Sequence, residues 1–293
     1  MNKEEFTKEL VDIISRCLGE LYLVEEKCIT KNNNTKFQAI SIQAKGKDAA
    51  MLIYVDELFK NYHRGRCIYD IVDEILDLCH GKYPHYDSSI VDNLLHMLDK
   101  IYCKFINTEA NAMFLYDTPH KEWNDLSIVY YFYLGQEDDI HQTVTISNKL
   151  LKLLGLSLEA LDQLAMANTK RDLYPRIQDL GPLYRKSNEY DMETLCDKHS
   201  LHIVTNSLKI SGAIGVLFEE CLADFARRMN ATHLWVIPSS IHEMLLLVDD
   251  GTMDSRYIRQ TIHDVNVRKV APEEVLSWNC YFYDSRHNTI TVA

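Results

Sequence analysis

Glycine and proline are both scarce in this chain, with ten glycines and six prolines among 293 residues. So low a content excludes collagen-like and low-complexity proteins and argues against a chain dominated by loops. No apolar run approaches the roughly 18 residues that a membrane-spanning helix requires. The first residues include early acidic side chains and no apolar segment of the signal-peptide kind. We therefore expect a cytoplasmic protein without a membrane segment.

Blocks of basic residues are also missing. The formal net charge is −12, and the densest basic cluster spans only residues 63–66. An acidic surface repels the phosphates of nucleic acids and of anionic membranes. Nucleic acid is therefore an unfavourable partner, and a protein partner or a small ligand is the better expectation. The residues point to no particular cofactor or oligomeric state.

The eight cysteines show no short-range pairing rhythm, and most fall inside apolar periodic segments. This distribution favours buried free thiols in a reducing compartment over a disulfide framework. Hydrophobic residues make up 46% of the chain and charged residues 25%. Both values are near those of globular proteins, so the chain can bury a sizeable core.

Hydrophobic periodicity predicts clusters of helices and strands rather than a strict alternation of the two. Clusters of this kind favour an α+β fold with mixed or antiparallel sheets and packed helices. We expect two subdomains, 1–118 and 119–293, divided where Thr118-Pro119 ends a helical cluster. The first subdomain is predicted to contain helices at 4–18, 68–79, 90–105 and 107–115, and a meander of strands at 21–28, 37–44 and 50–55. The second is predicted to contain strands at 126–134, 140–146, 202–205, 233–237, 243–248, 280–283 and 289–292, and helices starting at 158, 213 and 254.

The loop at residues 238–243 is the first candidate site, because it joins two strongly apolar strands. Its polar side chains should collect at one end of a sheet, where ligand sites often lie. Serine, histidine and glutamate are also the types used in nucleophilic catalysis, although catalysis requires a three-dimensional arrangement that adjacency does not supply. The alternative is a tight turn whose hydroxyls satisfy backbone groups. The residues concerned are Ser239, Ser240, His242 and Glu243.

Two further patterns offer weaker candidates. Cys196, His199 and His202 have metal-ligand side chains at close spacing, but no second pair completes a zinc site. The alternative is a helix end leading into a strand. Small residues at 209–215 mark a strand-to-helix junction, where backbone amides could approach an anion. The alternative there is close helix–sheet packing, in which glycine avoids a clash.

Tyrosines recur in two predicted strands, at 130, 131 and 133 and at 281 and 283. On a sheet they could line a groove. Buried tyrosines more often pack in the core and hydrogen-bond through their hydroxyls.

An ordered set of stretches is similar to a known family. They are 125–131, 204–206 with 212–213, 237–243, and 270–277 preceded by 264–266. Together they resemble an uncharacterised domain-of-unknown-function family found mainly in gut anaerobic Gram-positive bacteria. The resemblance covers essentially the whole chain, except that residues 178–200 look short. It implies a cytoplasmic bacterial protein, and it carries over no activity, cofactor or catalytic residue.

Two functional hypotheses follow. The first is a non-catalytic binding or protein-interaction module, motivated by an acidic, well-packed chain without a recognised catalytic motif. The second is a hydrolase-type enzyme with its site near residues 238–243. A deep pocket on which His242 and a carboxylate converge would favour the enzyme. A broad face without such convergence would favour the interaction module.

Overall fold

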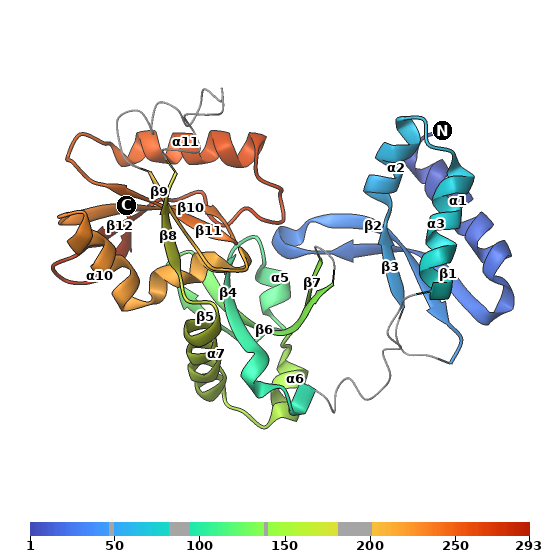
Figure 1. Cartoon of the computed structure of the whole chain (residues 1–293), viewed down its shortest axis with the longest axis horizontal. Helices are drawn as coiled ribbons and strands as arrows, with labels where there is room; N and C mark the ends of the chain where they lie inside the picture. The colour runs from blue at the N-terminus through green and yellow to red at the C-terminus, as the bar shows by residue number, and fades with distance from the viewer. Residues whose placement is uncertain (47–49, 82–93, 138–139, 181–200) are drawn as a thin grey trace. The chain divides into compact units, whose positions relative to one another are not determined.

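The computed structural model describes residues 1–46, 50–81, 94–137, 140–180 and 201–293, which form helices and three antiparallel sheets (Figure 1). The predicted α+β class is confirmed. The chain divides into two compact units, Met1–His96 and Met97–Ala293. This division falls before the predicted boundary near residue 118, because strand β4 pairs with strand β6 and so belongs with the second unit. Within the described ranges, no helix is long and apolar enough to cross a membrane.

The first unit is a three-stranded sheet, in the order β1-β2-β3, packed against helices. Helix α1 begins with a capping box, in which Asn2 and Glu5 satisfy each other's backbone N–H groups. The core includes Phe6, Leu10 and Ile40, all fully buried. The predicted helix and antiparallel meander are therefore present. The elements are α1 (Lys3–Leu18), η1 (Gly19–Leu21), β1 (Tyr22–Thr30), η2 (Asn32–Asn34), β2 (Lys36–Ala44), β3 (Met51–Tyr54), α2 (Val55–His63) and α3 (Ile68–Gly81).

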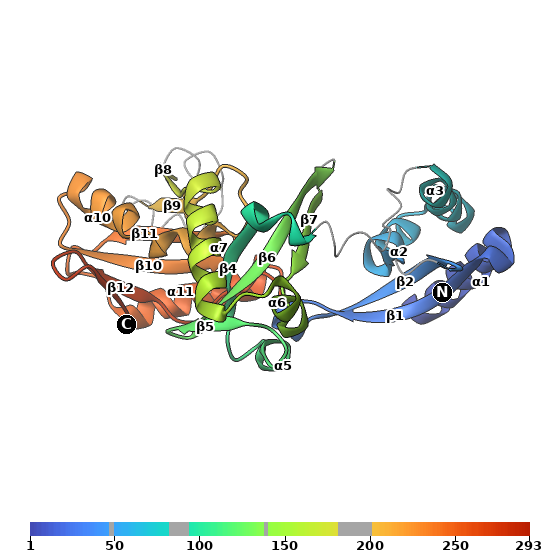
Figure 2. The same cartoon turned by 90° about the horizontal axis from the view of Figure 1, so that it is seen from below.

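The second unit begins with a four-stranded sheet centred on the long strand β6, one face of which is covered by helix α7 (Figure 2). Ser157 caps α7, as its position in the sequence predicts. Tyr130 on β6 donates a hydrogen bond to Asp162 on α7, over 2.9 Å. The elements are η3 (Leu98–Lys100), β4 (Ile101–Asn107), α5 (Ala112–Leu115), β5 (His120–Trp123), β6 (Leu126–Glu137), β7 (Ile140–Thr145), α6 (Asn148–Leu154) and α7 (Leu158–Asp172).

A six-stranded antiparallel sheet, in the order β13-β12-β10-β11-β9-β8, completes the second unit. Helix α11 packs on one face, where Ile258 and Ile262 join a cluster that includes Trp235. Helix α10 packs on the opposite face (Figure 1), with Phe225 against His202. The elements are β8 (Arg176–Asp179), β9 (His202–Thr205), η4 (Gly212–Leu217), α10 (Glu219–Arg228), β10 (His233–Ser240), β11 (Glu243–Val248), α11 (Ser255–Arg268), β12 (Tyr281–Asp284) and β13 (Thr289–Val292).

Three predicted helices need correction. The stripe predicted as a helix at 90–105 ends in strand β4, because Ile101 and Phe105 are four residues apart and share a face in either structure. Ile90 lies outside the described residues. The helix predicted at 107–115 is only the single turn α5. The helix predicted from residue 213 is interrupted, because a 3₁₀ segment, η4, precedes α10.

The cysteine prediction holds only in part. The seven described cysteines are free, and Cys103, Cys221 and Cys280 are buried. Cys17 and Cys28 are exposed, as is Cys67. Cys17 lies on the solvent-exposed side of α1. The apolar spacing of the sequence had placed it with the buried residues of that helix.

Candidate functional site

The candidate loop at 238–243 is tighter than predicted, because strand β10 continues through Ser240 and β11 starts at Glu243. A bulge between Pro238 and Ser240 shifts the register at the end of the strand. Ser239 Oγ donates to Glu243 Oε1 over 2.8 Å. Ser240 Oγ accepts from the backbone N–H of His242 over 3.1 Å. Both hydroxyls therefore hold the hairpin together, and neither bond is to the histidine ring.

The ring of His242 lies between two segments that are distant in the sequence. Its Nδ1 accepts a hydrogen bond from the backbone N–H of Ser211 over 3.1 Å. This bond assigns the proton of the neutral ring to Nε2. Nε2 lies 3.6 Å from Glu274 Oε1, which is too long for a good hydrogen bond. The Nε2–H is thus the ring's available donor, with a carboxylate beside it.

The loop that supplies Ser211 has an unusual backbone. Lys209 and Ser211 have φ values of 56° and 50°, in the left-handed region that favours glycine. Buried Asn206 holds the loop, since its side chain donates to the carbonyl of Ile210 and accepts from the N–H of Leu208. Strained residues of this kind persist where the surroundings over-determine them, often at functional sites.

Gly212 sets the distance between this loop and the hairpin. A Cβ at this position would lie 2.6 Å from the carbonyl oxygen of His242 and 2.8 Å from the Cα of Thr205. Thr205 Oγ1 donates to the same His242 carbonyl over 3.0 Å. Glycine is therefore required by close packing, which was the alternative to the anion hypothesis for residues 209–215.

These segments enclose a pocket of about 420 Å³, open between the β10–β11 hairpin and helix α11. The volume is within the range of small-molecule sites. Apolar side chains form part of the lining, including Ile237, Leu245 and Val265. Charges of both signs also line it: Lys209, Arg268 and Lys269, and Glu243, Asp264 and Glu274. All four predicted residues, Ser239, Ser240, His242 and Glu243, belong to the lining.

Burial lowers the pKa of His242 below its ordinary value. The carboxylate of Glu274 acts in the opposite direction and is outweighed, while the positive charge of Lys104 adds to the lowering. The ring is therefore neutral at pH 7, as its bond from Ser211 requires.

This shift predicts that stability falls as the pH drops below about 6.5, the ordinary pKa of histidine. Between that value and the lower folded-state pKa, the unfolded chain binds a proton that the folded chain does not. The loss in the free energy of unfolding should approach about 1.4 kcal/mol for each unit by which folding lowers the pKa of His242. Thermal denaturation from about pH 7.5 to about pH 5.5 measures it. His242→Gln should flatten this dependence of stability on pH; a variant with the slope of the wild-type protein would contradict the prediction.

The structure does not bring the predicted metal ligands together among the described residues. Cys196 and His199 lie outside the described residues. His202 lies in β9, with its ring 4.8 Å from that of Phe225. In the described part of the chain, no group of three His, Cys, Asp or Glu side chains could hold a metal ion.

Sequence reasoning missed Glu274 and Ser211 as neighbours of His242. The sequence did contain a signal for this site, because the stretches that carry the family resemblance lie together around the pocket. Residues 237–243, 264–266 and 270–277 contribute to the pocket lining. Residues 204–206 and 212–213 form its support through Thr205 and Gly212.

Residues 3–285 match a family described as a family of unknown function, DUF5688. No curated protein and no solved structure matches the chain.

Proposed function

The chain belongs to this family of unknown function, and we propose that it is a binding protein for a small molecule that occupies the pocket between the β10–β11 hairpin and α11. The observation that carries the proposal is the convergence of a hairpin, a strained loop and a helix on one cavity of ligand size. The ligand class is a partly apolar molecule with polar or charged groups, since the lining offers apolar side chains and charges of both signs.

Contacts at the hairpin favour binding over catalysis. A nucleophilic serine needs a base within hydrogen-bond distance. Ser239 donates to the Glu243 carboxylate and not to the ring of His242, whose Nδ1 is occupied by the backbone N–H of Ser211, so the Ser–His pair of a serine hydrolase is not formed. The hydrolase alternative retains one supporting feature, the His242–Glu274 pair in a pocket. Turnover of an ester probe that is lost in Ser239→Ala would favour the hydrolase.

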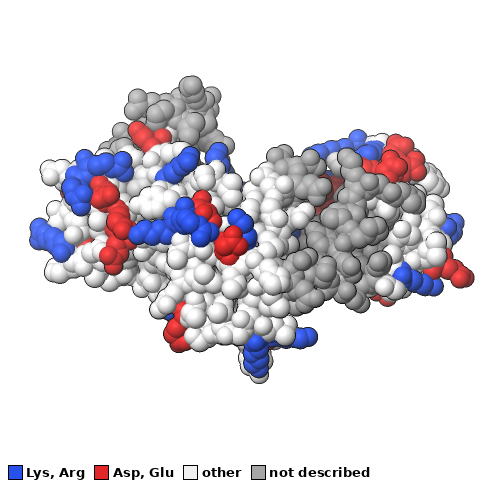
Figure 3. All heavy atoms as spheres, turned by 60° about the horizontal axis from the view of Figure 1, so that its bottom comes forward, with Lys and Arg blue, Asp and Glu red and all other residues white. Residues whose placement is uncertain are grey.

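Surface charge supports a ligand other than nucleic acid. On the face drawn in Figure 3, blue and red side chains of the larger unit are interspersed rather than gathered into a broad basic patch. Several cations of this unit are paired, as Lys170 is with Glu220 and Arg227 with Asp224, both at 2.8 Å. Nucleic-acid sites instead present clustered basic side chains.

A cytoplasmic location is part of the proposal. Three of the seven described cysteines are exposed free thiols. Such thiols persist in compartments that glutathione and thioredoxin keep reduced. Fractionation of the source cells, followed by detection of the protein, tests the location.

Filling the pocket provides the main test. Val265 lines the pocket and is half-buried, whereas Val267 lies two residues further along α11 and is exposed. We expect Val265→Trp to weaken ligand binding by at least about tenfold, because the indole occupies ligand space, and Val267→Trp to leave it unchanged.

The ligand itself is sought by native mass spectrometry of gently purified protein, followed by ligand-observed NMR with the retained compound. Retention by the wild-type chain and by Val267→Trp, but not by Val265→Trp, supports the proposal. Retention by all three proteins would show that the compound binds outside this pocket and would contradict the proposal. A bare mass, with no binding in a small-molecule screen, would favour a protein-interaction module.

A further inference from the structure

Two polar side chains are neighbours on the face of the β4–β6 sheet that is turned away from α7. In the antiparallel register, Tyr102 on β4 lies opposite Tyr131 on β6, and Lys104 lies opposite Val129. Residues two apart on a strand share a face, so Lys104 is the diagonal neighbour of Tyr131. The Lys104 ammonium lies 5.6 Å from the centroid of the Tyr131 ring.

Lys104 has no counter-ion among the residues that the structure describes. Its side chain is half-buried, and burial lowers the pKa of its amine. In the described part of the chain, no carboxylate lies within ion-pair distance of it. Its ammonium lies over the aromatic face of Tyr131, within the range of a cation–π contact. Partial burial of an ammonium without an anion costs part of its hydration, and lysines with little exposure are usually paired.

Tyr131 lacks a hydrogen bond. Its side chain is 1% exposed, and its hydroxyl is the buried side-chain polar atom without a hydrogen-bond partner among the described residues. Burial raises the pKa of this hydroxyl to about 12. The Ser211 hydroxyl is close enough to lower that pKa as a weak donor, but the pair does not meet the distance and angle of a hydrogen bond, so the Tyr131 O–H has no acceptor there.

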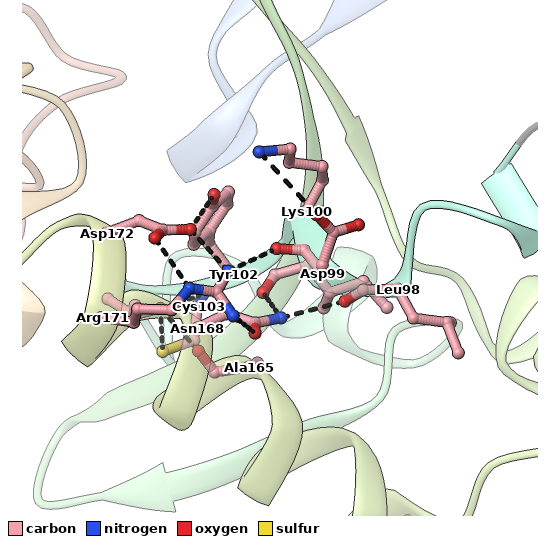
Figure 4. Close-up of polar contacts among 11 residues, drawn as sticks. Leu98, Asp99, Lys100, Tyr102, Cys103, Ala165, Asn168, Arg171 and Asp172 are labelled. Atoms are coloured by element: carbon pink, nitrogen blue, oxygen red, sulfur yellow. Dashed lines mark hydrogen bonds and ion pairs between the residues drawn. The ribbon is translucent and has the colours of Figure 1, made fainter.

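Other buried tyrosines of this unit differ from Tyr131. Tyr102 donates to Asp172 over 2.8 Å, in a network that Arg171 and Asn168 extend (Figure 4). Tyr130 and Tyr281 also donate to carboxylates. Among the described residues, Tyr131 therefore differs from these tyrosines in having no partner for its hydroxyl, and the adjacent Lys104 has no counter-ion there either.

We propose that Lys104 and Tyr131 form a binding site for an anionic oxygen group, either a carboxylate or a phosphate. A half-buried ammonium next to a buried hydroxyl, both without an acceptor among the described residues, is complementary to an acceptor that carries negative charge. A bound anion would neutralise the ammonium and accept from the hydroxyl, and so remove both costs at once. The site does not rest on the pocket proposal, since neither Lys104 nor Tyr131 lines that pocket.

The site adjoins the hairpin through shared neighbours. Ser211 affects the Tyr131 hydroxyl through its side chain, and its backbone N–H binds His242. The charge of Lys104 in turn lowers the pKa of His242. An anion at Lys104 would cancel that effect, so its binding should raise the pKa of His242, which NMR titration of the ring can follow.

The test measures the melting temperature of the full chain in sodium acetate and, separately, in sodium phosphate, against sodium chloride at the same ionic strength. At tenfold excess over Kd, the bound probe should raise the melting temperature of the larger unit by about 3–5 °C. The acetate and phosphate arms distinguish the two kinds of anion. No rise with either probe overturns the proposal.

Three variants locate the effect. Lys104→Met should abolish the rise and, without a probe, melt no lower than wild type, because it removes an unpaired charge. Tyr131→Phe should weaken binding by about tenfold, as loss of one hydrogen bond to a charged group does. Lys209→Met removes a cation of the hairpin pocket and should keep the rise. A rise that is lost in Lys209→Met but kept in Lys104→Met and Tyr131→Phe would overturn the site.

Discussion

Replacing Asp125 with alanine is expected to lower the free energy of unfolding of the larger unit by about 3–5 kcal/mol. Asp125 lies in the turn between β5 and β6 and accepts three hydrogen bonds from a segment far along the chain. The donors are the hydroxyls of Ser277 and Tyr281, both at 2.6 Å, and the side-chain amide of Asn279 at 3.1 Å. Alanine would leave all three donors without their acceptor. Since Ser277 and Tyr281 are fully buried, water cannot easily replace the carboxylate.

Urea denaturation of matched variants measures this loss. Tyr281→Phe removes one of the three bonds and should cost about 1–2 kcal/mol. Glu122→Ala, at an exposed residue of the same hairpin, should change stability by less than about 0.5 kcal/mol. If Asp125→Ala proved no more destabilising than Glu122→Ala, the proposed connection between the two sheets of this unit would be wrong.

Replacing Gly212 with alanine is expected to lower the free energy of unfolding by about 3 kcal/mol, which is the second large effect. The new methyl carbon would lie 2.6 Å from the His242 carbonyl oxygen and 2.7 Å from Thr205 Oγ1. Backbone atoms form part of this contact, so a side-chain rotation cannot relieve it. Either the loop or the hairpin must move, which should disturb the Ser211–His242 hydrogen bond as well.

Gly155→Ala is the matched control for this prediction. Gly155 has φ 66° and nothing within 4 Å of an added Cβ, so its replacement incurs only the conformational cost, about 1 kcal/mol. Chemical denaturation compares the two variants, and the chemical shifts of the His242 ring report whether the hairpin has moved. Equal losses of stability, with unchanged His242 shifts, would refute the close-packing account of Gly212.

Local sequence patterns determined much of the secondary structure of this protein. The Ser157 cap, the long apolar strand β6 and the terminal hairpin of β12 and β13 follow from cap preference and periodicity. These signals involve only a few neighbouring residues, so they can be recognised in the sequence without knowledge of the fold. The pattern failed in β4, because a spacing of four residues places Ile101 and Phe105 on one face in a helix and in a strand alike.

The sequence also marked residues 238–243 as a place where polar groups gather, since they end two apolar strands. Which groups meet there was decided by tertiary structure. His242 touches Ser211 and Glu274, which lie some thirty residues away in opposite directions along the chain. The same holds for the hydrogen bond between Asp125 and Tyr281, and for the contact of Lys104 with the ring of Tyr131. Periodicity specifies which face a residue occupies, but only the packing of sheets, loops and helices determines what that face contacts.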